Sequence, residues 1–199
     1  MRHRRSPTSI GVTLCLAGAA GLLSLSCTSD RKLEGDALIG RGQYLVATSG
    51  CDDCHSPKIF TEMGPHPDPK RRLSGHPAGS TLPAVPYDLL SPDKWGAVTT
   101  PDMTAWAGPW GISFGVNLTP HPDGLGLWTE EQFVKSLKSG MHLGVGRPVL
   151  PPMPWPNYSK MSDEDLRAMF AYLKTLPPIA NLVPQPTPPQ LTQTETAKP

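Results

Sequence analysis

The segment GCDDCH holds the residues of this sequence whose spacing is most specific for a chemistry. Cys51 and Cys54 are separated by two residues, and His55 follows the second cysteine directly. Thiol and imidazole groups at this spacing occur in three kinds of site. These are a structural zinc site, a redox dithiol, and the covalent attachment of a haem.

The rest of the sequence separates these three possibilities. A zinc site needs four nitrogen or sulfur ligands, and no cysteine follows Cys54. The remaining histidines do not occur in the paired spacing of zinc sites. A thioredoxin-like dithiol would follow a strand, whereas a helical pattern precedes Cys51. C-x-x-C-H therefore favours one haem c, attached covalently through Cys51 and Cys54, with His55 as an iron ligand.

A sixth ligand to the iron is expected from the segment VLPPMPWP, which contains Met153. Prolines on both sides restrict the backbone and hold the loop extended, so that a thioether is presented to iron with little ordering cost. The alternatives are Met141, Met103, His142 and an open sixth position. Methionine opposite histidine raises the reduction potential relative to two histidines, and it fills the position that oxygen or peroxide would need.

The element before the motif is predicted to be a helix. Residues 36–50 place Leu38, Gly42 and Leu45 on one helical face, with Asp36 as the expected N-cap. A glycine on such a face permits the close approach of another backbone. We therefore expect Gly42 to lie at a helix crossing.

Two further helices have clear end signals. In WTEEQFVKSLKSG, Thr129 and Gln132 form a capping box and Gly140 stops the helix. In MSDEDLRAMFAYLKTLPP, Ser162 is the N-cap. The spacing i, i+3, i+4, i+7 in the second helix predicts one buried face, formed by Leu166, Met169, Phe170 and Leu173.

Proline makes up 25 of the 199 residues and divides the rest of the chain. Residues 56–117 are rich in proline and are predicted to be mostly loop, with one small hairpin in the segment 97–117. Residues 181–199 are rich in proline, threonine and glutamine and are predicted to be a disordered tail. No internal repeat or second domain is indicated.

The N-terminus has the pattern of an export signal. A basic head precedes an apolar stretch over residues 10–25, which is too short for a membrane span and rich in small residues. LSLSC resembles a lipoprotein cleavage box, so we expect a signal peptide over residues 1–26, lipidation of Cys27, and a polar tether over 27–35. A membrane anchor, or cleavage after residues 17–19, are the alternatives.

Charge and cysteine content exclude two function classes. The net charge is +1, and loss of the three arginines in residues 1–26 lowers it to −2, so no basic field for binding nucleic acid is present. With Cys27 lipidated, only Cys51 and Cys54 remain, which is not the pattern of a disulfide scaffold.

The order of these features resembles a class I c-type cytochrome over residues 36–180, of the membrane-associated bacterial type with GVNLTP and PPMPW segments. The resemblance implies an all-α fold with an insertion of about residues 56–117, and it places Met153 at the distal ligand. It also implies that Gly42 and Tyr44 form the crossing with the C-terminal helix. Candidate hydrogen-bond partners for the haem propionates are Trp155, Tyr158, Asn117 and Arg147, and ordinary loop packing is the alternative for each.

The function expected from this resemblance is single-electron transfer by one haem on the periplasmic side of a membrane, without catalysis. The redox partner would be a dehydrogenase, an oxidase or another cytochrome. An alternative is a cytochrome subunit of a dehydrogenase or oxidase complex, with the insertion as the binding element. A haem peroxidase or gas sensor with a displaceable sixth ligand is a further alternative.

Overall fold

The computed structural model describes residues 33–90 and 93–189. The predicted signal peptide, the lipidation site Cys27 and most of the tether lie outside these residues. Within the described ranges, no helix is both long enough and apolar enough to cross a membrane.

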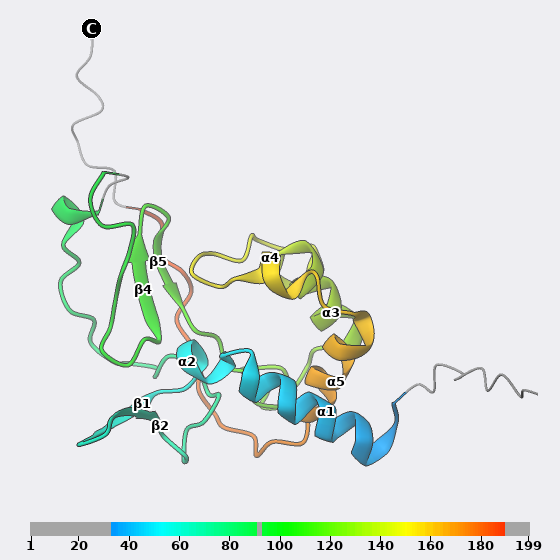
Figure 1. Cartoon of the computed structure of the whole chain (residues 1–199). Coiled ribbons are helices and arrows are strands. Elements are labelled where there is room, and N and C mark those ends of the chain that lie inside the picture. Colours follow the sequence, from blue (N-terminus) through cyan, green and yellow to red (C-terminus); the bar gives the residue numbers. More distant parts are fainter. Residues whose placement is uncertain (1–32, 91–92, 190–199) are drawn as a thin grey trace, which may run out of the picture. The chain divides into compact units, whose positions relative to one another are not determined.

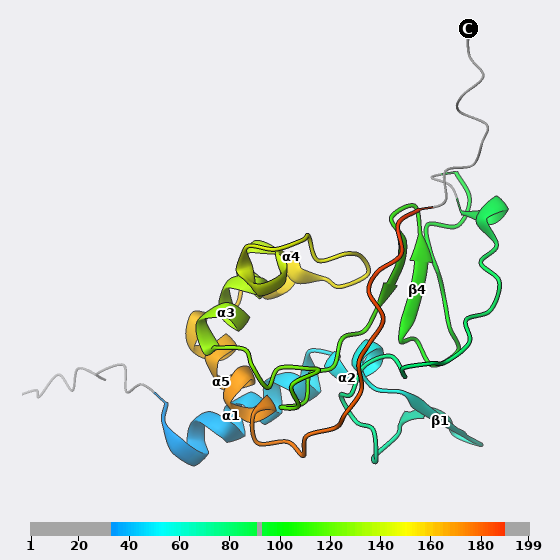
Figure 2. The ribbon, with the colours of Figure 1, turned by 180° about the vertical axis from the view of Figure 1, so that it is seen from behind.

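Helices and short strands separate into two regions of the described chain (Figures 1 and 2). The helices are α1 (Gly35–Thr48), α2 (Cys51–His55), α3 (Glu130–Ser139), α4 (Trp155–Tyr158) and α5 (Asp163–Leu173), with 3₁₀ turns η1 (Tyr87–Leu89) and η2 (His142–Gly144). The strands are β1 (Lys58–Thr61), β2 (Gly64–Pro67), β3 (Val98–Thr99), β4 (Ala105–Gly108) and β5 (Gly111–Phe114).

Helices α1 and α5 cross at Gly42. A Cβ added there would overlap the backbone carbonyl of Ala168 and lie 2.8 Å from the Cβ of Tyr172, so the crossing requires glycine, as predicted. Tyr44 does not take part: it is 59% exposed, and the guanidinium of Arg41 lies over its ring. The expected role of Tyr44 is wrong because two residues turn a helix by about 200°.

The core is formed by the inner faces of α1, α3 and α5. The rings of Phe133 in α3 and Phe170 in α5 have centroids 5.3 Å apart. Val46, Leu166 and Leu173 are almost completely buried. The helix face predicted from the spacing in α5 is therefore the face that packs into the core.

The predicted caps of α3 and α5 are confirmed. Both hydrogen bonds of the Thr129–Gln132 capping box are present, and Gly140 ends α3 with a φ of 68°. Ser162 accepts a hydrogen bond from the backbone of Asp165 at the start of α5. The N-cap prediction for the first helix is wrong, because Asp36 lies inside the first turn and no side chain caps α1.

The predicted insertion, residues 56–117, contains every strand of the described chain. Strands β1 and β2 form an antiparallel pair, and β3, β4 and β5 form an antiparallel three-stranded sheet in sequence order. The hairpin predicted in this segment is β4–β5, with Ala105 opposite Phe114. The additional pairings replace segments that were predicted to be loop, so the described chain combines helices with two small sheets.

The C-terminal segment is ordered as far as residue 189, contrary to the predicted disorder from 181. Asn181 Nδ2 donates to the backbone carbonyls of Ser74 and His76, at 2.7 and 2.9 Å. Thr187 pairs with Ile112 of β5 in an antiparallel bridge. Composition indicated disorder, but the backbone of Thr187 pairs with the edge strand β5 and so satisfies its polar groups within a proline-rich segment. Residues 190–199 lie outside the described chain.

Candidate functional site

The C-x-x-C-H motif forms the short helix α2. It begins after Gly50, whose φ of 72° favours glycine and turns the chain sharply out of α1. Cys51 is buried, Cys54 is half-buried, and both are free thiols. Residues three apart in a helix lie on the same face, so both sulfur atoms are available to one ligand.

His55 has a defined tautomer. It is 9% exposed, and its Nδ1 lies 2.8 Å from the backbone carbonyl of Val116. A carbonyl only accepts, so Nδ1 carries the proton and Nε2 keeps its lone pair. Burial lowers the pKa of His55, which favours the neutral ring. Among the described residues, Nε2 makes no hydrogen bond, so this nitrogen is the one left to bind iron.

Two segments of the insertion pack directly on the motif. The backbone N–H of Gly75 donates to the carbonyl of His55 at 2.7 Å. A Cβ on Gly115 would overlap the carbonyl oxygen of Cys54, so the chain after β5 lies against the motif. Sequence reasoning assigned no role to these residues. In the sequence, only the two glycines could have indicated this close packing, and a glycine does not show which segment packs against it.

The thiols are not of the reactive type. Burial, with a smaller effect from the charge of Asp52, raises the pKa of Cys51 to about 12. Burial and the charge of Asp53 also raise the pKa of Cys54. Redox dithiols and zinc ligands depend on a lowered thiol pKa. In residues 33–90 and 93–189, moreover, no three His, Cys, Asp or Glu side chains gather as metal ligands. The redox-dithiol and zinc-site interpretations therefore gain no support.

Asp52, between the two cysteines, is held by an arginine of the insertion. Arg72 donates to Asp52 Oδ2 from Nη2 at 2.6 Å and from Nε at 3.1 Å. Its Nη1 donates to the hydroxyl of Tyr172 in α5 at 2.9 Å. One guanidinium thus joins the insertion, α2 and α5, and no sequence pattern indicated this contact.

Met153 lies in the loop before α4 (yellow in Figure 1). Its side chain is half-buried and packs against the core. The loop is fixed to β5, because Ser113 Oγ donates to the carbonyl of Pro151 at 2.5 Å. Figures 1 and 2 show this loop reaching toward β5, whereas α2 follows directly on α1. The predicted ligands are therefore carried by two separate segments of the chain, α2 and the loop before α4.

The three alternative ligands occupy other parts of the structure. Met141 takes part in a backbone bridge with Pro148. Met103 sits in the turn before β4 with a φ of 59°. His142 packs edge-on against Trp128, with ring centroids 5.1 Å apart. Each of these positions has a structural role of its own.

Two of the expected propionate partners are already used in the structure. The hydroxyl of Tyr158 donates to the carbonyl of Ser49 at 2.7 Å, which ties α4 to the end of α1. Asn117 Nδ2 donates to the carbonyl of Ile179 at 2.9 Å, and Asn117 is 2% exposed. Both side chains therefore hold segments of the chain together.

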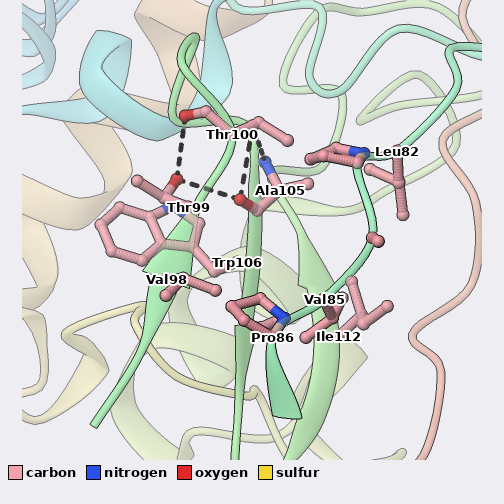
Figure 3. Close-up of a pocket in the computed structure, with 12 residues that line it drawn as sticks. Leu82, Val85, Pro86, Val98, Thr99, Thr100, Ala105, Trp106 and Ile112 are labelled. Atoms are coloured by element: carbon pink, nitrogen blue, oxygen red, sulfur yellow. Dashed lines mark hydrogen bonds between the residues drawn. The ribbon is translucent and has the colours of Figure 1, made fainter. Parts of the chain in front are cut away.

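A small pocket lies in the insertion and not at the motif (Figure 3). Its volume is about 140 Å³, and it lies between residues 82–86 and the sheet β3–β4–β5. The hydroxyl of Thr99 donates to the carbonyl of Ala105 at 3.0 Å, and that of Thr100 donates to Asp102 Oδ1 at 2.6 Å, so both are already satisfied. Trp106 lines the pocket and also lies close enough to Cys54 to lower its thiol pKa, against the larger effect of burial.

No family model matches the chain. It is 31% identical over 159 residues to the cytochrome c subunit of alcohol dehydrogenase (quinone) from Gluconobacter oxydans, covering 79% of this chain and 25% of that protein. It is 29% identical over 158 residues to the gluconate 2-dehydrogenase cytochrome c subunit of Pantoea cypripedii, covering 79% and 27%. A diheme cytochrome c-type protein of Cereibacter sphaeroides is 28% identical over 181 residues, covering 88% and 49%.

The chain thus spans about a quarter of the length of the first two relatives and about half of the third. All three carry the words cytochrome c in their names, and the first two are subunits of dehydrogenases. These similarities support a c-type cytochrome with covalently bound haem c.

Proposed function

We propose that this chain is a mono-haem c-type cytochrome that transfers single electrons for a dehydrogenase. Cys51 and Cys54 would attach the haem covalently, and His55 and Met153 would be the ligands that hold the iron. The helical part would then have the class I cytochrome c fold, with residues 56–117 as an insertion. When bound, the haem supplies reversible one-electron exchange between Fe(III) and Fe(II).

The observation that carries this proposal is the state of His55. Its Nδ1 is committed to the carbonyl of Val116, and its Nε2 is free on the helix that also carries two thiols. Such an outer-shell hydrogen bond is the usual partner of an iron-bound imidazole, because it fixes the ring and raises the basicity of the ligand. The residues present therefore fit a covalently attached haem.

The remaining residues of the site act by positioning. Gly75 and Gly115 allow the insertion to pack on α2 and keep His55 in one orientation. The Met153 loop, fixed by Ser113, would cover the sixth position and exclude water and small ligands from it. This arrangement favours electron transfer over peroxidase or gas-sensor activity, and no bond of a substrate is made or broken.

The partner is proposed from the relatives. Because the first two are cytochrome subunits of dehydrogenases, a dehydrogenase is the favoured electron donor for this chain. One haem is proposed because the given sequence contains a single C-x-x-C-H motif. Export by residues 1–26 and lipidation of Cys27 would place the protein at the periplasmic face of a membrane.

The test is the absorption spectrum of protein matured in a host that attaches haem c. We expect a haem that resists extraction by acidified ketone and remains with the chain on a denaturing gel. Cys51→Ser or Cys54→Ser should weaken the attachment, and His55→Ala should abolish the native spectrum. Complete extraction from the wild type would refute the proposal.

The proposed partner is tested by purifying a tagged protein from its own cells. A dehydrogenase should be recovered with it, and the absence of a dehydrogenase would refute that partner.

A further inference from the structure

Asp52 is the first of the two residues between the cysteines, and both oxygens of its carboxylate accept hydrogen bonds. Arg72 binds Oδ2 through two nitrogens, and Ser56 Oγ donates to Oδ1 at 2.7 Å. The carboxylate is 19% exposed and the guanidinium is 33% exposed, so the pair is partly withdrawn from water. Charge-assisted bonds of this kind hold both groups in one geometry.

Both charges act at the attachment site. Burial is the main cause of the raised pKa of Cys51, and the charge of Asp52 raises it further while Arg72 lowers it. Asp52 stands between the two cysteines and three residues before His55, and Arg72 Nη2 binds its carboxylate at 2.6 Å. Both charges therefore lie next to the residues that would hold the haem.

We infer that Arg72 is a positioning residue that neutralises Asp52 within the haem-attachment motif and thereby keeps the reduction potential of the haem high. The inference rests on the proposed haem function and concerns residues outside the ligand set. Fe(III) carries one more positive charge than Fe(II), so an uncompensated carboxylate nearby stabilises Fe(III) and lowers the potential. An uncompensated guanidinium has the opposite effect.

The expected size follows from electrostatics. A unit charge about 10 Å from an iron, at an effective dielectric constant of about 20, changes a one-electron equilibrium about tenfold. Since both side chains are partly exposed, solvent screens the effect, and a several-fold change in the Fe(III)/Fe(II) ratio at fixed potential is expected.

The experiment is a redox titration of the holoprotein in four forms: wild type, Arg72→Gln, Asp52→Asn and the double variant. Arg72→Gln should lower the midpoint potential, Asp52→Asn should raise it, and the double variant should return close to the wild type. Arg71→Gln is the matched control, because Arg71 pairs with Asp68 in an exposed i, i+3 bridge and should not shift the potential. Arg72→Lys, which keeps the charge, should stay near the wild type even if it lowers thermal stability.

The pattern of signs separates a charge effect from a loss of structure. Damage to α2 would shift both single variants in the same direction, and the double variant would be the most affected. That result, or equal potentials in all four forms with intact spectra, would overturn the inference while leaving the haem assignment in place. A wild type without covalent haem would instead overturn the proposed function.

Discussion

The Nδ1 of His55 and the carbonyl oxygen of Val116 lie 2.8 Å apart although 61 residues separate them in the sequence. The hydrogen bond joins the end of the insertion to His55, the residue directly before the insertion. Because a carbonyl can only accept, this one contact fixes the tautomer of the imidazole. The segment that follows β5 therefore orients the ring that we propose as an iron ligand.

Gly115→Ala tests this control. The added Cβ would overlap the carbonyl oxygen of Cys54, so the chain after β5 must move away from α2 and weaken the His55–Val116 hydrogen bond. We expect a loss of about 1–3 kcal/mol in the free energy of unfolding, as for other overpacked sites. A weaker hydrogen bond makes the imidazole less basic, so the reduction potential should rise.

Gly96→Ala is the control for this variant. Gly96 lies in the same insertion, and an added Cβ would meet no atom within 4 Å. Thermal unfolding and a redox titration of both holoproteins measure the difference. If Gly115→Ala has the stability and potential of Gly96→Ala, the contact between the insertion and the motif does not hold His55.

A second prediction concerns the crossing of α1 and α5. Gly42→Ala would press a methyl group into the backbone of Ala168, and we expect a loss of at least about 1–3 kcal/mol. Gly40 lies on the exposed face of the same helix with open space around it, so Gly40→Ala should stabilise the protein by up to about 1 kcal/mol. Opposite signs in chemical denaturation of the two variants are the expected result. Equal signs would contradict the close approach at Gly42.

The C-terminal segment provides a third prediction. Asn181→Ala removes hydrogen bonds to the backbone of Ser74, His76 and Ala78, which should cost about 1–3 kcal/mol. It should also expose residues 181–189 to proteases. Gln185→Ala, an exposed residue of the same segment, should change neither property. If the wild type is already cleaved within 181–189 as fast as Asn181→Ala, the segment is not held in place.

The parts of this structure that the sequence predicted are those determined by neighbours along the chain. The capping box of Thr129 and Gln132 and the N-cap Ser162 each involve residues within one helical turn. The contacts of Val116 with His55, Arg72 with Asp52, and Asn181 with Ser74 join residues far apart in sequence. Each uses a backbone carbonyl or a common charged group, so no local pattern identifies the partner.

Predictions from composition were wrong for two segments, the insertion and the C-terminal segment. The strands of the insertion are at most four residues long and contain glycine and proline, so they give little periodic signal. Thr187 belongs to a segment whose composition indicates disorder, yet its backbone pairs with Ile112. Gly111 makes this approach possible, because a Cβ there would overlap the carbonyl oxygen of Thr187. Pairing through the backbone is independent of side-chain composition.

The last prediction is that Met153 holds the sixth position of the iron in both oxidation states. Its loop is bounded by prolines and tied to β5 through Ser113, so the thioether is already ordered and is lost mainly by mutation. Met153→Ala should lower the reduction potential, remove the weak far-red absorption band, and open the iron to carbon monoxide or cyanide. Met141→Ala and Met103→Ala should change none of these, since neither residue belongs to the loop before α4. A far-red band that survives in Met153→Ala but disappears in Met141→Ala would reassign the ligand and leave the covalent haem unaffected.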